Sequence, residues 1–140
     1  MASCIFCSIV RGDAAAEIVY ADGSALAFLD TAPLMPGHTL VITREHIETL
    51  DELPAGLIEP FFSLVQRVSR VQQSALSADG TFAGINTRVS QSVAHLHVHV
   101  VPRRRGDGLF GRGMVWVRKR YSAGEAEAVA AKMREALART

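Results

Sequence analysis

The sequence is poor in several features that mark whole classes of protein. Its 140 residues include two cysteines, one tryptophan and five prolines, and no apolar run approaches the ~18 residues of a membrane-spanning helix. The N-terminus has no charged region followed by an apolar stretch and a small-residue cleavage site, so we expect no secretory signal and a cytoplasmic location. Thiols stay reduced in that compartment, which argues against a disulfide framework.

Charge of one sign is also lacking. The formal net charge is +1, which gives no whole-surface field that would favour a membrane or a nucleic acid as the main partner. What the sequence has is apolar content: 49% of its residues are hydrophobic. A chain of this length and composition can bury one core, so we expect a single domain over residues 1–140.

Five segments have the alternation or the β-branched composition of strands. The first two flank the turn residues Asp22 and Gly23 and are expected to form an antiparallel hairpin. The predicted strands are residues 18–20, 25–29, 39–43, 82–88 and 95–101.

Two further segments have apolar residues at helical spacing. The longer one, residues 57–76, contains Pro60, which a helix tolerates in its first turn, so we expect the helix to begin near Glu59 or Pro60. Near the C-terminus, Ser122 and Glu125 form a capping-box pair ahead of a second apolar stripe. Strands and helices without strict alternation indicate an α+β fold, with an antiparallel sheet of about five strands, one long central helix and a C-terminal helix.

Three of the five histidines alternate with apolar residues in the segment 95–101. Successive side chains of a strand point to opposite faces, so His95, His97 and His99 share one side. At about 3.3 Å of rise per residue the outer two lie about 13 Å apart, too far for all three to bind one metal ion from one strand.

The alternation has three interpretations. It is typical of a half-exposed edge strand, of a pair of metal ligands such as His97 with His99, or of an imidazole nucleophile flanked by groups that bind phosphate oxygens. The third interpretation also uses the nearby polar residues Asn86, Gln91 and Ser92. A neutral imidazole nucleophile needs an acceptor for its second ring nitrogen, and we expect a main-chain carbonyl.

The segment His95-Leu96-His97-Val98-His99-Val100-Val101 resembles the His-x-His-x-His-x-x motif of the histidine triad (HIT) family of nucleotide hydrolases and transferases. Other parts of the chain resemble the family at Phe28-Leu29-Asp30, residues 36–42, Asn86, Gln91-Ser92-Val93 and Val101-Pro102-Arg103. The resemblance implies a HIT-like α+β fold, a homodimer, and hydrolysis of a nucleoside phosphoramidate or a dinucleoside polyphosphate at the α-phosphate.

The resemblance also implies catalytic roles. His97 attacks the α-phosphorus and forms a nucleotidyl-histidine that water hydrolyses, while His99 and Ser92 hold phosphate oxygens; this chemistry requires no cofactor. His38, which follows Gly37 and precedes a predicted strand, is expected to have a structural or indirect role.

For the substrate, a purine nucleotide, the resemblance implies a second set of residues. Asp30 accepts hydrogen bonds from the ribose hydroxyls, for which a carboxylate is suited. The alternative is that Asp30 is only the turn residue after a strand. Asn86 and Gln91 line the phosphate site. The base pocket is walled by Phe6, Ile9, Phe28 and Leu29.

Cys4 and Cys7 have a spacing that lets both thiolates bind one tetrahedral metal ion. The candidates for the two further ligands are His46 and His95, and some bacterial HIT proteins, which this segment resembles, bind zinc with the corresponding residues. A closed site with four protein ligands is structural. The alternative is two small thiols packed under the sheet.

Residues 101–120 contain seven lysines and arginines against one acidic residue, Asp107. We expect a loop near the mouth of the site that steers anionic substrates, the alternative being a solvated surface. We do not expect a nucleic acid partner, because Phe110, Trp116 and Tyr121 are too few to form a stacking platform.

The chain departs from the family pattern at two places. Ser90 stands where a glycine commonly precedes Gln91, and residues 100–140 follow the triad where the phosphoramidase branch usually ends soon after it with Trp-Pro-Pro-Gly. His99 favours hydrolysis, because the nucleotidylyltransferase branch has glutamine there. A nucleotide-binding module with little turnover and a metal-dependent phosphohydrolase remain alternatives.

Overall fold

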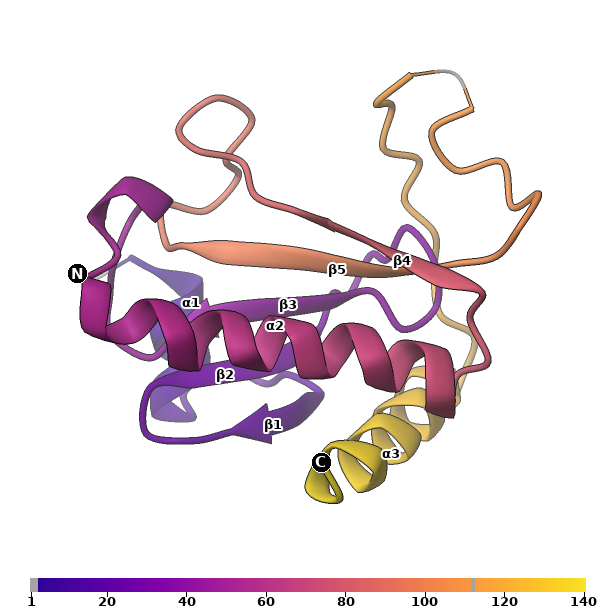
Figure 1. The fold of residues 1–140 in the computed structure, drawn as a ribbon, viewed down its shortest axis with the longest axis horizontal. Coiled ribbons are helices and arrows are strands. Elements are labelled where there is room, and N and C mark those ends of the chain that lie inside the picture. The colour runs from indigo at the N-terminus through magenta and orange to yellow at the C-terminus, as the bar shows by residue number, and fades with distance from the viewer. Residues whose placement is uncertain (1–2, 112) are drawn as a thin grey trace.

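The computed structural model describes residues 3–111 and 113–140 (Figure 1). Along the chain its elements are α1 (Ile5–Arg11), β1 (Ile18–Ala21), β2 (Ala25–Leu29), β3 (Thr39–Thr43), a 3-10 helix η1 (Leu50–Glu52), α2 (Ala55–Ala75), β4 (Gly80–Gly84), β5 (His97–Arg103) and α3 (Glu125–Ala138). The strands pair antiparallel in the order β1-β2-β3-β5-β4. The predicted α+β fold is confirmed. None of the helices in these two ranges has the length and apolarity needed to cross a membrane.

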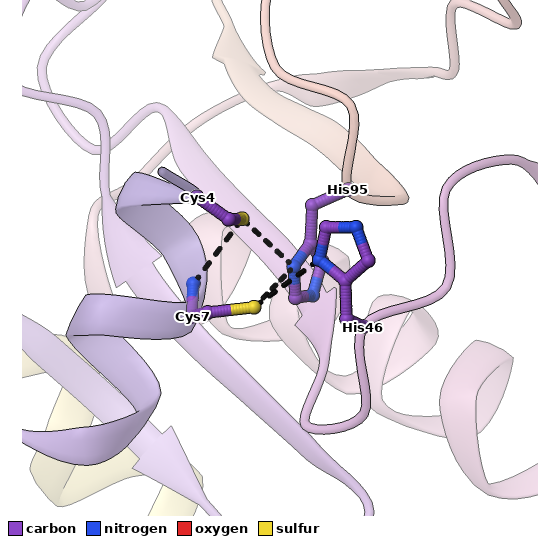
Figure 2. A group of neighbouring side chains, drawn as sticks. All are labelled: Cys4, Cys7, His46 and His95. Atoms are coloured by element: carbon purple, nitrogen blue, oxygen red, sulfur yellow. Dashed lines mark hydrogen bonds between the residues drawn. The ribbon is translucent and has the colours of Figure 1, made fainter. Parts of the chain in front are cut away.

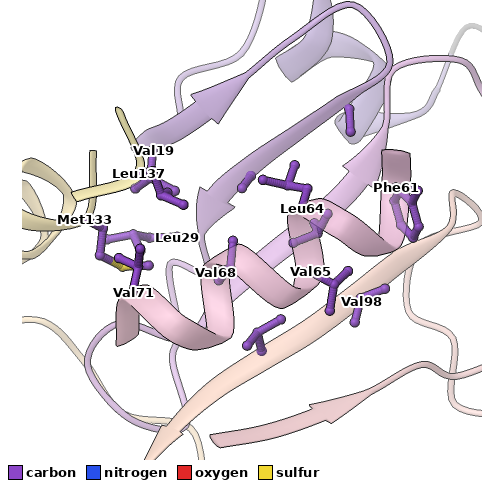
Figure 3. Packing of buried hydrophobic residues seen from close by; sticks show 14 of the residues in the cluster. Val19, Leu29, Phe61, Leu64, Val65, Val68, Val71, Val98, Met133 and Leu137 are labelled. Carbon is purple, nitrogen blue, oxygen red and sulfur yellow. The ribbon is translucent and has the colours of Figure 1, made fainter. Parts of the chain in front are cut away.

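The sheet separates two apolar clusters. On one face, α2 and α3 pack against alternate strand residues such as Leu29, Val41 and Val98, and Figure 3 shows the apolar stripe of α2 directed at the sheet. On the other face, α1 covers Leu26, Phe28, Leu40 and Ile42 with its own Phe6 and Ile9. Because strand side chains alternate, each buried strand serves both clusters.

Helix α2 begins earlier than the sequence predicted. Its first residue is Ala55, and Pro60 lies inside the helix instead of near its start. Proline lacks the N–H that would bond the carbonyl four residues earlier, which here belongs to Gly56. The apolar stripe continues with Phe61 and Leu64, both buried against the sheet. We infer that this packing outweighs the one missing backbone bond close to the helix end.

Two terminal elements differ from expectation in detail. Helix α1 was not predicted, because seven residues are too few to show a clear period; Cys4 accepts from the Cys7 amide at 3.4 Å at its start, and Gly12 ends it with a φ of 82°. Helix α3 has half of the predicted capping box: the Glu125 carboxylate accepts from the Ser122 amide at 2.9 Å, and the helix begins at Glu125 itself.

The last two strands are displaced from their predicted ranges. β4 ends at Gly84, which pairs with His99, and β5 begins at His97, which pairs with β3. The intervening chain leaves the sheet, and Arg88 and Ser90 adopt left-handed conformations with φ of 66° and 61°. A regular strand does not continue through such residues, so the predicted strand 82–88 ends early. His95 precedes the first paired residue of β5, His97, and lies outside the ladder.

Candidate active site and a cysteine-histidine cluster

His97 lies at the start of β5, on the face of the sheet that α1 covers. Its ring packs edge-on against Phe6, with the ring centroids 5.1 Å apart, and the residue is only 4% exposed. Its Nδ1 lies 2.7 Å from the main-chain oxygen of His95. A carbonyl can only accept, so Nδ1 carries the proton and Nε2 keeps a free lone pair. The predicted main-chain acceptor for this ring is confirmed.

The charge of His97 follows from its surroundings. Burial lowers the pKa of His97 below its ordinary value, and the hydrogen bond to the His95 carbonyl opposes that shift in part. A ring with a lowered pKa is neutral at pH 7. His97 therefore has the protonation state that a nitrogen nucleophile requires.

A second chain of hydrogen bonds determines the tautomer of His99. The Leu34 amide donates to Nδ1 of His38 at 3.0 Å, so the proton of a neutral His38 is on Nε2. That Nε2 lies 3.0 Å from Nδ1 of His99 and donates to it. A neutral His99 then carries its own proton on Nε2. His38 is fully buried and contacts His99 through this bond, and the structural or indirect role expected of it stays a prediction.

Three of the predicted phosphate-site residues line one cavity. Asn86, Ser92 and His99 contribute to a cavity of about 610 Å³, a volume within the ~300–1,000 Å³ of small-molecule sites. The other lining residues come from β4, the loop after it and the basic segment 101–120: Phe82, Gly84, Ile85, Ser90, Met114, Trp116 and Arg118.

The basic segment reaches the triad, as expected of a loop near the site. Trp116 packs on the ring of His99 with centroids 4.6 Å apart, and the Arg118 guanidinium lies 5.3 Å from the centroid of the Trp116 ring. The sequence analysis identified this segment by its charge alone and did not predict that Trp116 and Arg118 lie beside the triad. Arg112, one of its seven basic residues, lies outside the described residues.

Asp30 has partners on both carboxylate oxygens. Oδ1 accepts from the Ala32 amide at 2.9 Å and Oδ2 accepts from Nη1 of Arg118 at 2.8 Å. The same Oδ2 lies 3.7 Å from Nε2 of His38. Asp30, His38 and His99 are thus close enough to suggest a metal site, but both ring nitrogens of His38 already take part in the hydrogen bonds described above.

Two predicted substrate contacts are not where the sequence put them. Gln91 accepts from the Arg88 amide at 2.8 Å and donates to the Glu48 carbonyl at 2.7 Å, so its amide holds the loop after β4 instead of lining the cavity. Leu29 belongs to the core under α2 and α3, opposite its neighbour Phe28, because adjacent strand residues face opposite sides. It cannot share a base pocket with Phe28.

The remaining base-pocket candidates do gather on one face. Phe6, Ile9 and Phe28 pack together, and the rings of Phe6 and Phe28 are 5.5 Å apart. All three are less than 9% exposed. Ser90, which stands at the glycine position of the family, has the left-handed conformation that glycine favours, so the loop keeps that bend without glycine.

The cysteines and two histidines converge from three separate segments, as Figure 2 shows. Cys4 Sγ and Cys7 Sγ lie 3.4 and 3.6 Å from Nδ1 of His95, and Cys7 Sγ lies 3.2 Å from Nδ1 of His46. The other ring nitrogen of His95, Nε2, donates to the Thr43 carbonyl at 2.7 Å. That bond leaves an unprotonated Nδ1 directed at the sulfur atoms. No pattern in the sequence pointed to Thr43.

Because His38 and His99 are buried as neutral rings, we expect acid to destabilise the folded protein. Burial is the main cause that lowers the pKa of His38 to about 4 and of His99 to about 3. The unfolded chain, with pKa values near ~6.5, binds these protons more tightly, so stability is complete above pH 6.5 and falls as the pH drops toward 4. We expect the free energy of unfolding to fall less steeply in His38→Gln, by up to about 1.4 kcal/mol per pH unit for one proton.

Urea unfolding of both proteins at pH 7, 6, 5 and 4 measures that difference. Protons taken up by the cysteine-histidine cluster contribute to both proteins and cancel. Parallel curves for wild type and His38→Gln would contradict the predicted protonation state.

The family model and the relatives that match this chain all belong to one family. The model of the HIT domain matches residues 11–106. An uncharacterised HIT-like protein of Mycobacterium tuberculosis is 38% identical over 138 residues, which cover 96% of this chain and 93% of the relative. An adenosine 5′-monophosphoramidase of Schizosaccharomyces pombe is 34% identical over 118 residues, covering 81% of this chain and 83% of the relative.

A solved structure matches nearly the whole chain. It is a zinc-bound histidine triad family protein from Mycobacterium smegmatis, 37% identical, with a TM-score of 0.84. The match covers 99% of this chain and 95% of the other.

Proposed function

Because the chain belongs to the HIT family, we propose that it is a hydrolase that cleaves nucleoside phosphoramidates or dinucleoside polyphosphates at the α-phosphorus, with His97 as the nucleophile. The observation that carries the proposal is the tautomer of His97. The His95 carbonyl binds Nδ1–H, which leaves a buried, neutral imidazole with its lone pair on Nε2. The monophosphoramidase activity named for the S. pombe relative supports the same reaction class.

The first step exchanges one bond at phosphorus for another. Nε2 of His97 attacks the α-phosphorus, the P–N bond to histidine forms, and the bond to the leaving group breaks with its electron pair on the leaving nitrogen or oxygen. The attacking imidazole becomes a cation, which the His95 carbonyl stabilises through Nδ1–H. Water then attacks the α-phosphorus, the P–N bond breaks with its electron pair returning to Nε2, the proton that water loses passes to solvent, and the nucleoside monophosphate departs.

His99 is suited to the leaving group in the first step. Its tautomer presents an N–H on Nε2 in the same cavity as Ser92 and Asn86. A donor at this position hydrogen-bonds a phosphate oxygen or the departing atom. A phosphoramidate nitrogen needs that hydrogen bond more than a polyphosphate oxygen does, because an amine is the poorer leaving group; the proton that the departing amine takes up comes from solvent.

The direct test is release of AMP from adenosine 5′-phosphoramidate and from diadenosine triphosphate in parallel, followed by chromatography. Release from either compound supports the hydrolase and ranks the two leaving groups. Tight AMP binding with negligible release from both would favour the alternative of a nucleotide-binding module. The same assay with chelator, on protein whose fold is checked by circular dichroism, tests the metal-dependent alternative.

Asp30 is proposed to bind the ribose hydroxyls, and Arg118 must then share or leave its Oδ2. We expect wild type to bind AMP at least about 10-fold more tightly than 2′,3′-dideoxy-AMP, since a hydrogen bond to a charged group contributes ~1.5–3 kcal/mol. Asp30→Ala should remove that preference. Arg118→Met is the matched control: it removes the partner of Oδ2 but keeps the Asp30 carboxylate, so it should retain the preference for AMP over the dideoxy nucleotide. Titration calorimetry measures the dissociation constants of both nucleotides for each protein. Equal discrimination between the two nucleotides by wild type and Asp30→Ala would contradict a role of Asp30 in ribose binding.

The proposal includes a zinc ion held by Cys4, Cys7, His46 and His95. Donor atoms at neighbouring corners of a tetrahedral zinc site lie ~3.6 Å apart, from Zn–S and Zn–N bonds of ~2.3 and ~2.0 Å, and the observed S···N distances are 3.2–3.6 Å. Burial raises the pKa of the Cys7 thiol, which disfavours the thiolate, and a bound cation offsets that cost. The zinc-bound M. smegmatis neighbour adds support. Zinc in such a closed site supplies a crosslink, and no chemical step passes through it.

The assembly and location complete the proposal. We propose that residues 1–140 form one HIT-like domain, that two copies form a homodimer, and that the enzyme works in the cytoplasm on small nucleotides. Sedimentation equilibrium measures the mass in solution; a monomer at all concentrations would refute the dimer.

A further inference from the structure

We propose that the cysteine-histidine cluster positions the nucleophile as well as stabilising the fold, because His95 belongs to both sites. This inference rests on the proposed function and zinc site. The ring of His95 faces Cys4 and Cys7 through Nδ1. Its main-chain oxygen accepts the Nδ1–H of His97. One residue therefore connects a metal-ligand cluster to the atom that aims His97.

The peptide unit of the His95 carbonyl has one long-range backbone bond outside the sheet: its N–H, that of Leu96, donates to the carbonyl of Ile47, the residue after His46, at 2.7 Å. The ladder between β3 and β5 begins with Ile42 and His97, and the ladder between β4 and β5 ends with Gly84 and His99. The His95 carbonyl lies beyond both, so sheet pairing does not determine its direction. A turn bond from the His95 amide to Val93 at 2.8 Å holds the segment only locally.

The ring of His95 adds a side-chain anchor to the backbone bond from Leu96 to Ile47. It is fully buried, its Nε2 donates to the Thr43 carbonyl at 2.7 Å, and its ring packs edge-on against His46 with centroids 5.1 Å apart. The segment that contains His46 is thus tied to His95 by both backbone and side chain.

The consequence concerns the tautomer of His97. With the carbonyl in place, Nδ1 holds the proton and Nε2 is the nucleophile. If His95 moves, the ring is free to take the other tautomer or to turn away, and a misplacement of ~1 Å can lower a rate ~10²-fold. Nucleotide contacts elsewhere in the site do not depend on this bond. The expected signature is a loss in kcat with little change in the dissociation constant for AMP.

The test compares two substitutions that leave the same set of donors. His95→Cys and His46→Cys each give three cysteines and one histidine, a set that zinc accepts, but only His95→Cys removes the ring that orients the carbonyl. The readout is the imidazole ¹H–¹⁵N spectrum at neutral pH, with zinc content measured by mass spectrometry. We expect the Nδ1–H signal of His97 to persist in His46→Cys and to broaden or vanish in His95→Cys, with a 10- to 100-fold lower kcat in the latter.

Zinc removal from the wild-type protein by a chelator gives the same comparison without substitution. The signals of His38 and His99 serve as the internal control, because that pair has no contact with the cluster and reports an intact sheet. Loss of the His97 signal while theirs persist supports the inference. An unchanged His97 Nδ1–H signal in His95→Cys and in the zinc-free protein would overturn it. Neither spectrum depends on turnover, so a failure of the proposed activity is detected separately by the AMP-release assay.

Discussion

Replacement of His97 by alanine is expected to lower AMP release by about 10³-fold or more, which corresponds to at least about 4 kcal/mol of transition-state stabilisation. The reason is that the variant loses Nε2 of His97, the protein atom proposed to bond to phosphorus. The buried ring has few polar contacts besides that with the His95 carbonyl, and its loss leaves the paired oxygen of His95 without a donor. Binding of AMP should change far less than kcat, since Asp30, Ser92 and Asn86 are untouched.

Two further measurements distinguish a lost nucleophile from a damaged fold. Substrate labelled with ³²P at the α-phosphorus, mixed with enzyme and quenched in alkali, should leave label on wild-type protein and none on His97→Ala, because a P–N bond to histidine survives alkali. In His97→Gly, free imidazole should restore part of the rate by entering the vacated space. Wild-type turnover that survives the alanine substitution would end the proposal.

Loss of the two thiolates is expected to produce the largest change in stability. The double variant Cys4→Ser/Cys7→Ser should purify without zinc, whereas wild type carries about one ion per chain. At a zinc concentration 1,000-fold above its dissociation constant the ion stabilises the folded state by about 4 kcal/mol. For a chain of this size we therefore expect the melting temperature to fall by roughly 10 °C.

The chelator provides the matched control for that prediction. It should lower the melting temperature of wild type to that of the double variant and leave the double variant unchanged. If the two cysteines only pack beside His46 and His95 and bind no zinc, the chelator would leave the melting temperature of both proteins unchanged. A closed site of four ligands also predicts that zinc leaves slowly, so incubation time must be varied.

Much of the fold was predictable because its patterns are local. The short apolar run of β2 beside turn residues, the β-branched composition of β3 and the helical stripe that buries Phe61 and Leu64 indicate a sheet and a covering helix. The alternation of side chains in β5 puts His97 and His99 opposite Val98. Short or irregular segments had no such period, which is why α1 was missed and the loop after β4 was partly predicted as strand.

What the sequence by itself determined is the α+β fold, the shared side of His97 and His99, and the family to which the motif belongs. Tertiary structure alone decided the contacts between distant segments. Cys4 meets His95 across 91 positions of the chain, and Arg118 meets Asp30 across 88. Periodicity describes neighbours within one helix or strand and is silent on where loops meet. The direction of the His95 carbonyl, on which the proposed chemistry depends, arises from exactly such a meeting of loops and is therefore visible only in the folded chain.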